Sequence, residues 1–223
     1  FDLINDGVRI FLQKMAHAWQ QGSNPLESIY AESGLYGTSA TFVAPGDIFT
    51  IEDDGHAVME VNATRGSGKS RVTVFAGLIF RFNIGRAFAG ETYIREEKWG
   101  DGYVGTGATQ GIRVTTLEWP EFEKLFEVET NNEVEAREIL DPQFMEILHD
   151  WWQEHKTPVR LAFKQEYMYF SVPSGDLFEP SPFSSIESHK EELWGYLSVF
   201  RLAESLFAHI EHKYRLDLKA LGQ

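Results

Sequence analysis

The spacing of the predicted strands constrains the fold more than any other feature of this sequence. Segments 47–52 and 56–64 have strand character and flank Asp53-Asp54-Gly55, a turn in which the Asp-Gly pair tolerates positive φ. A second short turn, residues 65–69, leads into the long apolar segment 70–84. Strands joined by turns this short pair antiparallel. The sequence therefore predicts hairpins, and not a sheet in which parallel strands alternate with helices.

Segment 70–84 has the pattern of a central strand. Leu78 and Phe80 share one face and Ile79 lies on the other, so both faces are apolar, and Gly77 marks a predicted bend. Together with the remaining segments, this pattern predicts a mostly antiparallel sheet of roughly six to eight strands. The further predicted strands are 91–96, 112–118, 126–129, 159–164 and 167–172, with a glycine-rich loop at 99–111.

Helices are predicted before, between and after these strands in the sequence. Thr130 and Glu133 have the spacing of a capping box, and Asp141-Pro142 is typical of an N-cap followed by the first helical residue. Apolar residues at helical spacing predict helices over the other segments. The predicted helices are 2–20, 26–33, 121–125, 130–140, 144–154 and 186–218.

The whole chain, residues 1–223, is expected to form one α+β domain. It would consist of an N-terminal helix within 1–25, a sheet and helix core within 26–185, and a long C-terminal helix within 186–223. Apolar residues of the last helix recur at steps of three and four. We expect this helix to cover the sheet with these residues. The alternative is that they form a coiled-coil seam in a homodimer. These residues are Leu193, Tyr196, Phe200, Ala203, Phe207, Ile210 and Tyr214.

Charge and cysteine content limit the partners and the chemistry. The chain has 34 acidic and 20 basic residues and a net charge of −14. Nucleic-acid binders need a basic surface, so we expect no nucleic-acid partner, and an anionic membrane should repel the chain as a whole. The absence of cysteine excludes disulfides and thiolate nucleophiles. No apolar run is long enough to span a membrane, so membrane attachment would need segments outside this chain.

Two glycine-rich motifs only partly match nucleotide-binding signatures. The pattern G-x-G-x-x-G occurs at residues 100–105, but no predicted helix follows to hold a pyrophosphate. Segment 66–70 resembles the end of a P-loop, yet Ala63 stands where the first glycine belongs. These partial matches predict no nucleotide cofactor. Because the sequence also lacks a G-x-S-x-G nucleophile motif and the histidine spacing of a zinc site, we predict no catalytic residue and no metal site. Lys69 is instead a contact candidate on a cationic turn.

Three segments, in this order, resemble one bacterial family. Residues 74–80 are similar to an F-x-G-L-F-F strand, residues 122–128 to F-E-K-x-F-E-V, and residues 135–145 to E-A-R-x-I-L-x-P-x-F-M. With Ser33-Gly34-Leu35-Tyr36, they resemble the family known as domain of unknown function 3137 over about residues 26–172. The resemblance implies no assigned activity. It also implies hydrophobic segments before the domain, so we expect the soluble, cytoplasmic part of a membrane-anchored protein.

Four residues of these and neighbouring segments are further contact candidates. Arg137 follows Glu133 by four residues, the spacing of a helical ion pair, and its alternative partner is a buried acid such as Glu127. Trp151 and Trp152 are candidates because adjacent helical residues point about 100° apart, so one of the two can face a ligand.

These observations favour a non-enzymatic binding or scaffolding domain with a protein partner. Two alternatives stay open. An enzyme, for example a hydrolase, would use carboxylates near the glycine-rich loop, such as Glu96, Glu97 and Asp101. A small-molecule or lipid-binding module would use the aromatic strand and Trp151 or Trp152 around an internal apolar cavity.

Overall fold

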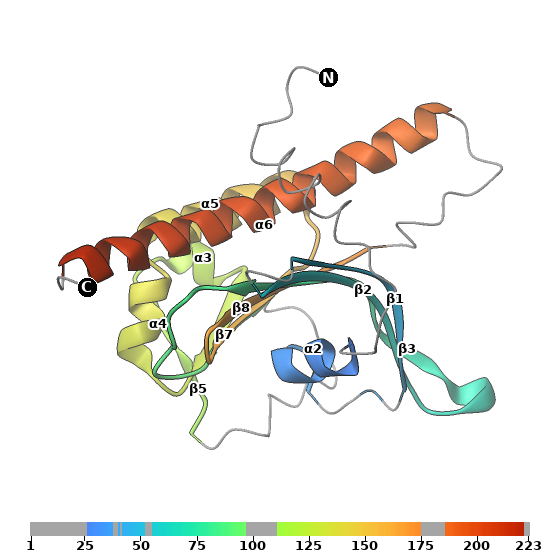
Figure 1. The fold of residues 1–223 in the computed structure, drawn as a ribbon, viewed down its shortest axis with the longest axis horizontal. Helices are drawn as coiled ribbons and strands as arrows, with labels where there is room; N and C mark the ends of the chain where they lie inside the picture. Colours follow the sequence, from blue (N-terminus) through green and yellow to red (C-terminus); the bar gives the residue numbers. More distant parts are fainter. Residues whose placement is uncertain are drawn as a thin grey trace.

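Eight strands form a single sheet in the computed structural model, which describes residues 26–37, 40, 42–51, 55–96, 111–174 and 186–220 (Figure 1). The strands are β1 (Phe42–Ile51), β2 (His56–Arg65), β3 (Val72–Asn83), β4 (Thr92–Glu96), β5 (Arg113–Thr115), β6 (Phe126–Thr130), β7 (Arg160–Lys164) and β8 (Tyr167–Pro173). Their order is β1–β2–β3–β8–β7–β4–β6–β5, and each of these described pairs is antiparallel. The predicted mostly antiparallel sheet is therefore confirmed.

Helices flank the sheet, which confirms the predicted α+β class. The described helices are α2 (Leu26–Ser33), α3 (Pro120–Glu123), α4 (Glu133–Ile139), α5 (Pro142–His155), the long C-terminal α6 (Ile186–Ala220) and the short 3-10 helix η1 (Gly68–Ser70). The predicted N-terminal helix and most of the glycine-rich loop lie outside the described residues. Within the described part of the chain, no helix is long and apolar enough to cross a membrane.

The sheet places strands that are far apart in the sequence next to each other. The hairpins β1–β2, β2–β3 and β7–β8 join sequence neighbours, as predicted. The β7–β8 hairpin, however, lies between β3 and β4, so Ile79 pairs with Ser171 on one side and Tyr93 pairs with Ala162 on the other. These long-range pairs place the later strands at the centre of the sheet.

The first strand is longer than the sequence pattern indicated. The prediction placed its start at residue 47, whereas β1 begins at Phe42. Its pairing with β2 shifts register between Pro45 and Ile48. An irregularity of this kind interrupts the alternation of side chains, and a proline is tolerated at such a point of an edge strand. The broken alternation explains why the first half of β1 was not predicted.

Gly77 allows two backbones to approach each other closely. A Cβ atom at this position would collide with the carbonyl oxygen of Val172 and would lie only 2.7 Å from the amide nitrogen of Ser174. The predicted bend is therefore a point of contact between β3 and the end of β8, where a residue with a side chain does not fit.

Apolar side chains cover both faces of the sheet, because residues alternate between the faces along each strand. Figure 1, in which the sheet is seen nearly edge-on, shows α5 and α6 over one face and α2 at the opposite face. The core under α5 and α6 includes Leu78, Phe80, Phe82, Leu161, Phe163, Phe170, Leu148, Phe200, Leu206 and Ile210. The core under α2 includes Ile29, Tyr30, Leu35, Tyr36, Met59, Phe75, Ile79, Tyr93 and Tyr169.

The rings of the aromatic strand pack directly against their neighbours. Phe80 is fully buried, and its ring centroid lies 6.0 Å from that of Phe82, 5.5 Å from that of Phe170 and 5.2 Å from that of Phe200. Rings at these separations are in contact. Phe80 and Phe82 of β3 therefore contribute to the packed core between the sheet and α6.

The two connected helices α4 and α5 begin at different kinds of cap. Asn132 caps α4 by accepting a bond from the Glu135 amide, so the predicted start at Thr130 is wrong. Thr130 instead ends β6, where its hydroxyl donates to the Glu91 carbonyl oxygen. Asp141 caps α5 as predicted, accepting from the Phe144 amide at 2.9 Å. Local cap chemistry therefore sets where each helix starts.

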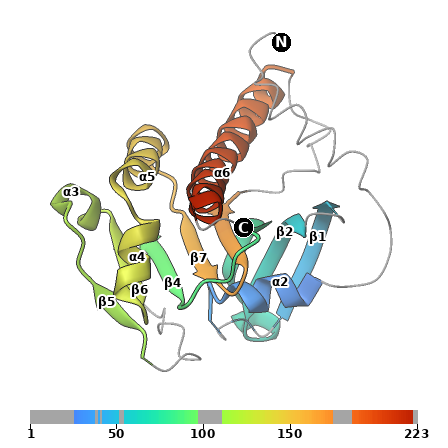
Figure 2. The same ribbon diagram turned by 60° about the vertical axis from the view of Figure 1, so that its left-hand side comes forward.

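Helix α6 covers the sheet with its C-terminal part, in agreement with the expectation. Phe200, Ala203, Ile210 and Tyr214 of the predicted apolar seam are buried in the core. The N-terminal part of α6 rises away from the sheet, as both ribbon views show (Figures 1 and 2). Trp194, in that part, is 57% exposed.

Candidate functional site

Glu135, in the family-like segment 135–145, is a buried acid that holds a loop in place. The side chain is 4% exposed, and its carboxylate accepts hydrogen bonds from the backbone amides of Ala89 and Gly90, each at 2.8 Å. A side chain at position 90 would come 2.5 Å from the Cβ atom of Asn132, so the loop lies directly against the start of α4. Glu135 therefore ties the β3–β4 connection to α4 through charge-assisted hydrogen bonds. Sequence reasoning missed this role, because spacing does not reveal which acid is buried.

Asp141 connects two helices, α5 and α6, through one carboxylate. Besides capping α5, it accepts hydrogen bonds from His209 Nε2 at 3.0 Å and from Lys213 Nζ at 2.8 Å, both on α6. Burial alone would raise the pKa of this carboxyl group. The bonds from Lys213, the Phe144 amide and His209 outweigh burial, so the pKa of Asp141 is lowered. The charged form of Asp141 thus holds the start of α5 against α6.

The candidates Arg137 and Glu127 have different partners. Arg137 is exposed and donates to the carbonyl oxygen of Thr116 at 3.2 Å. Glu127 on β6 accepts a bond at 2.9 Å from the Nε of Arg95, the residue opposite it on β4. The guanidinium that holds Glu127 therefore comes from the neighbouring strand and not from Arg137.

The same guanidinium also contacts a second acid of β6. Arg95 Nη2 lies 3.0 Å from Glu129, which is 9% exposed. Burial raises the pKa of Glu129, the charge of Arg95 lowers it in part, and the nearby Glu127 raises it again, so that the net shift is upward. The two acids are two residues apart and share one face of the strand. This cluster is therefore an array of ion pairs around Arg95 in which burial raises the pKa of Glu129.

The two adjacent tryptophans face different surroundings. Trp151 is buried, and its ring stacks on His155 with centroids 4.6 Å apart. Trp152 is half-buried, its Nε1 donates to Glu96 Oε1 at 3.1 Å, and Lys156 Nζ lies 4.1 Å from its ring centroid. Trp152 is therefore the member of the pair that reaches the surface, where it joins α5 to the end of β4.

Of the three carboxylates that the enzyme alternative would use, the structure describes only Glu96. Glu96 lies at the end of β4 and its carboxylate accepts the bond from Trp152. Glu97 and Asp101 lie outside the described residues. The contact of Glu96 assigns this acid a role in joining β4 to α5.

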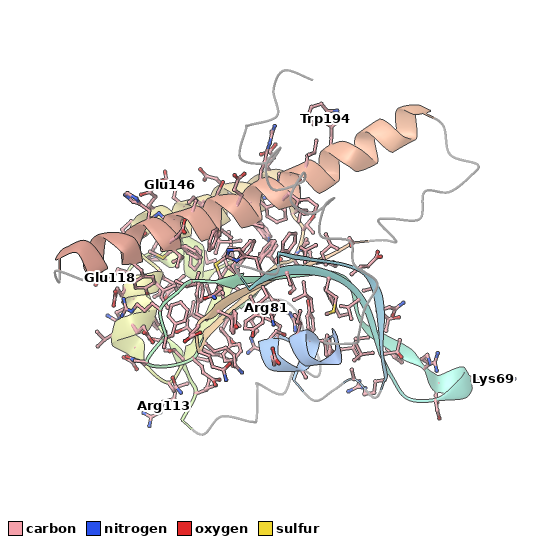
Figure 3. The ribbon with its side chains drawn as sticks, in the orientation of Figure 1. Lys69, Arg81, Arg113, Glu118, Glu146 and Trp194 are labelled. Atoms are coloured by element: carbon pink, nitrogen blue, oxygen red, sulfur yellow. The ribbon has the colours of Figure 1, made fainter. Side chains whose placement is uncertain are left out.

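Two exposed elements extend from the packed body. Figure 3 shows Lys69 at the outer end of the β2–β3 hairpin, and Trp194 on the part of α6 that rises away from the sheet. Every residue from 65 to 73 is exposed, and Trp194 is 57% exposed. The contact candidate Lys69 therefore lies on an exposed tip, whereas no sequence signal singled out Trp194. The structure thus offers two candidate contact surfaces, the hairpin tip (residues 65–73) and the projecting part of α6 around Trp194.

The fold and these contacts define an α+β domain whose acidic side chains connect its elements. A family model described as "Protein of unknown function (DUF3137)" matches residues 73–216, which is more than half of the chain, and the chain belongs to this family. A crystal structure of the mycobacterial trehalose monomycolate transport factor A, TtfA, is similar at 14% sequence identity and a TM-score of 0.43, covering 90% of this chain and 93% of that one. None of the curated proteins matches the sequence.

Proposed function

We propose that this chain is a binding or scaffolding domain that docks a partner protein on the projecting part of α6. The observation that carries the proposal is the uneven burial of this helix. Its C-terminal part packs Ala203 and Ile210 into the core, whereas Trp194 stands 57% exposed on the part that rises from the sheet. Tryptophan is among the residue types most enriched at the centres of protein interfaces. An amphipathic helix with an exposed aromatic anchor suits docking into an apolar groove of a partner.

The roles of the family-like acids support this proposal. Glu135 holds the β3–β4 loop and Asp141 holds α5 against α6, so both carboxylates serve the shape of the domain. In a binding domain, the residues that maintain the fold can be separate from the residues that contact the partner. The packed rings of β3 also favour protein contact over the small-molecule or lipid-binding alternative, which needs an open apolar cavity.

If the partner is a second copy of this chain, we propose that the homodimer forms through the same surface of α6. Phe200, Ala203, Ile210 and Tyr214 of the predicted seam are buried within the domain, so a dimer would use side chains outside that set, with Trp194 among them. We further propose that the domain is the cytoplasmic part of a membrane-anchored protein. This last proposal rests on the family resemblance, which implies hydrophobic segments before the domain.

Replacing Trp194 tests the proposal. The full-length protein is purified gently from its own cells as the wild type, as Trp194→Ser and as Val134→Ser, and each sample is weighed by native mass spectrometry. Val134 is the matched control, because it is an apolar residue that is 80% exposed on α4. The wild type and Val134→Ser should carry one protein of defined mass, or a second copy, and Trp194→Ser should lose it. A partner retained by Trp194→Ser would refute the α6 site. Turnover of a substrate that Glu96→Gln abolishes would refute the non-enzymatic function.

A further inference from the structure

The charge of this acidic chain is distributed unevenly. Residues 61–90 contain five arginine or lysine residues and no aspartate or glutamate, in a chain whose net charge is −14. Three of these cations lie at the β2–β3 connection: Arg65 is the last residue of β2, and Lys69 and Arg71 lie between the two strands. The overall repulsion from anionic surfaces that the net charge predicts therefore does not hold at this turn.

The hairpin tip carries these cations to the edge of the molecule. The tip, residues 65–73, is exposed along its whole length, and Figure 3 shows Lys69 at its outer end, beyond the curved sheet. Its backbone is ordered by a bond from the Ser70 amide to the Ser67 carbonyl oxygen, and the Ser70 hydroxyl donates to the same oxygen at 2.9 Å. Arg65 still pairs with Val72 across the hairpin. The charges are thus presented on a short, formed element.

We propose that this tip docks on the anionic lipid headgroups of a membrane surface. Each lysine or arginine near such a surface contributes attraction without needing a shaped pocket, because the lipid charges form a continuous layer. Gly66 and Gly68 have no side chain and that of Ser67 is small, so the backbone of the tip can lie close to that layer. Val72, which is 57% exposed beside the cations, adds an apolar contact at the headgroup level.

The size of the tip favours a lipid surface over an acidic protein. A stable protein–protein interface takes about 20–30 residues from each partner. The exposed tip consists only of residues 65–73. A few cations are sufficient for weak, reversible attraction to an anionic bilayer. In a protein that is already anchored in the membrane, such a weak contact adds to the attachment.

The acidic body sets the orientation and the salt dependence of this contact. With a net charge of −14, the body is repelled by the same surface that attracts the tip, so the domain approaches end-on through the hairpin. At physiological ionic strength the Debye length is about 8 Å, so acidic groups of the body that lie farther than this from the tip oppose its attraction to the surface only weakly. Binding should be strongest at low salt and should vanish at 1 M salt, where the Debye length is about 3 Å.

A single fluorescent label provides the test. Because the chain contains no cysteine, Ser67→Cys accepts one environment-sensitive fluorophore at the tip, and Val134→Cys accepts it on α4 as a control. The labelled proteins are titrated with phosphatidylcholine vesicles that contain or lack phosphatidylglycerol. The label at position 67 should respond only to the phosphatidylglycerol vesicles and only at low salt, and the label at position 134 should not respond.

Charge variants then identify which residues produce the response. In the Ser67→Cys background, Arg65→Gln/Lys69→Gln should weaken vesicle binding about 25-fold, since each cation contributes about fivefold. Arg113→Gln is the matched control, because Arg113 is exposed at the far end of the sheet, and it should leave binding unchanged. These side chains are exposed, so circular dichroism should report the same fold for all variants. Absent vesicle binding, binding that Arg113→Gln weakens equally, or a response to soluble poly-glutamate but not to vesicles would overturn the proposal.

Discussion

Asp141 allows the contact between α5 and α6 to be tested quantitatively. Replacement by asparagine keeps a good helix cap but removes the negative charge, because Asn and Asp cap about equally well. Replacement by alanine removes both the cap and the charge. The two variants therefore separate the bond to the Phe144 amide from the bonds to His209 and Lys213 on α6.

The structure sets the size of each effect. Buried hydrogen bonds to a charged group contribute roughly 1.5–3 kcal/mol, but the side chain of Asp141 is 27% exposed, so solvent weakens them. We expect Asp141→Asn to lower the free energy of unfolding by about 1–2 kcal/mol. Asp141→Ala should lower it by about 2–3 kcal/mol, since the lost cap adds about 1 kcal/mol. For a domain of this size, these losses correspond to melting temperatures lower by roughly 4 °C and 8 °C.

Urea and thermal unfolding at several pH values measure these losses. Because the folded-state pKa of Asp141 is lowered, its charge stabilises the fold above the unfolded pKa of about 3.9, and this stabilisation is lost as the pH falls through the folded value. The difference between the wild type and Asp141→Asn should therefore be constant near neutral pH and disappear in acid. Combining Asp141→Asn with Lys213→Met should give less than the sum of the single losses. An Asp141→Asn variant as stable as the wild type, or full additivity with Lys213→Met, would refute the contact.

Three further substitutions, with Gly195→Ala as a control, test other parts of the fold by urea unfolding. Gly77→Ala should destabilise the protein by about 2 kcal/mol or more, because the added Cβ collides with the Val172 carbonyl oxygen. The control Gly195→Ala lies in an exposed helical position with open space around it. It should be neutral or stabilising by up to about 1 kcal/mol. Glu135→Gln should cost about 1–3 kcal/mol and speed amide hydrogen exchange in the β3–β4 loop, since only one amide oxygen remains to accept two bonds. Glu129→Gln should be neutral or stabilising at pH 7, because burial raises the pKa of Glu129 and makes its charge costly in the fold. The advantage of this variant over the wild type should disappear as the pH falls and Glu129 becomes protonated.

Three results would contradict the roles assigned to Gly77, Glu135 and Glu129. A Gly77→Ala protein as stable as Gly195→Ala would show that the backbones of β3 and β8 have room for a side chain. Unchanged hydrogen exchange in Glu135→Gln would separate this acid from the loop. A large loss of stability in Glu129→Gln at neutral pH would mean that attraction to Arg95 outweighs burial.

Local patterns were sufficient to predict most elements but not their arrangement. The hairpins follow from turn residues and the start of α5 follows from Asp141-Pro142, since these signals lie within a few residues of one another. The position of β8 beside β3 depends on pairs such as Ile79 with Ser171, which are far apart in the sequence. Such pairs are set by packing against both faces of the sheet, and no local pattern records them.

The contact candidates differ in how well the sequence indicated them. Lys69 lies on an exposed turn, as its glycine-rich and cationic surroundings suggested. The partner of Glu127 was not predictable, because Arg95 reaches it only through the pairing of β4 with β6. The exposure of Trp194 also depends on the path of α6 relative to the sheet, which helical spacing alone does not give.

The contact that α6 makes in the cell tests the central claim most directly. A photo-crosslinking amino acid is introduced in place of Trp194 in the full-length protein, and in place of Val134 in a control, and living cells are irradiated. If α6 docks a partner, position 194 should yield one crosslinked species of defined mass, either a different protein or a second copy, and position 134 should not. Equal crosslinking from both positions, or none from position 194, would contradict the account of this chain as a binding domain that acts through α6.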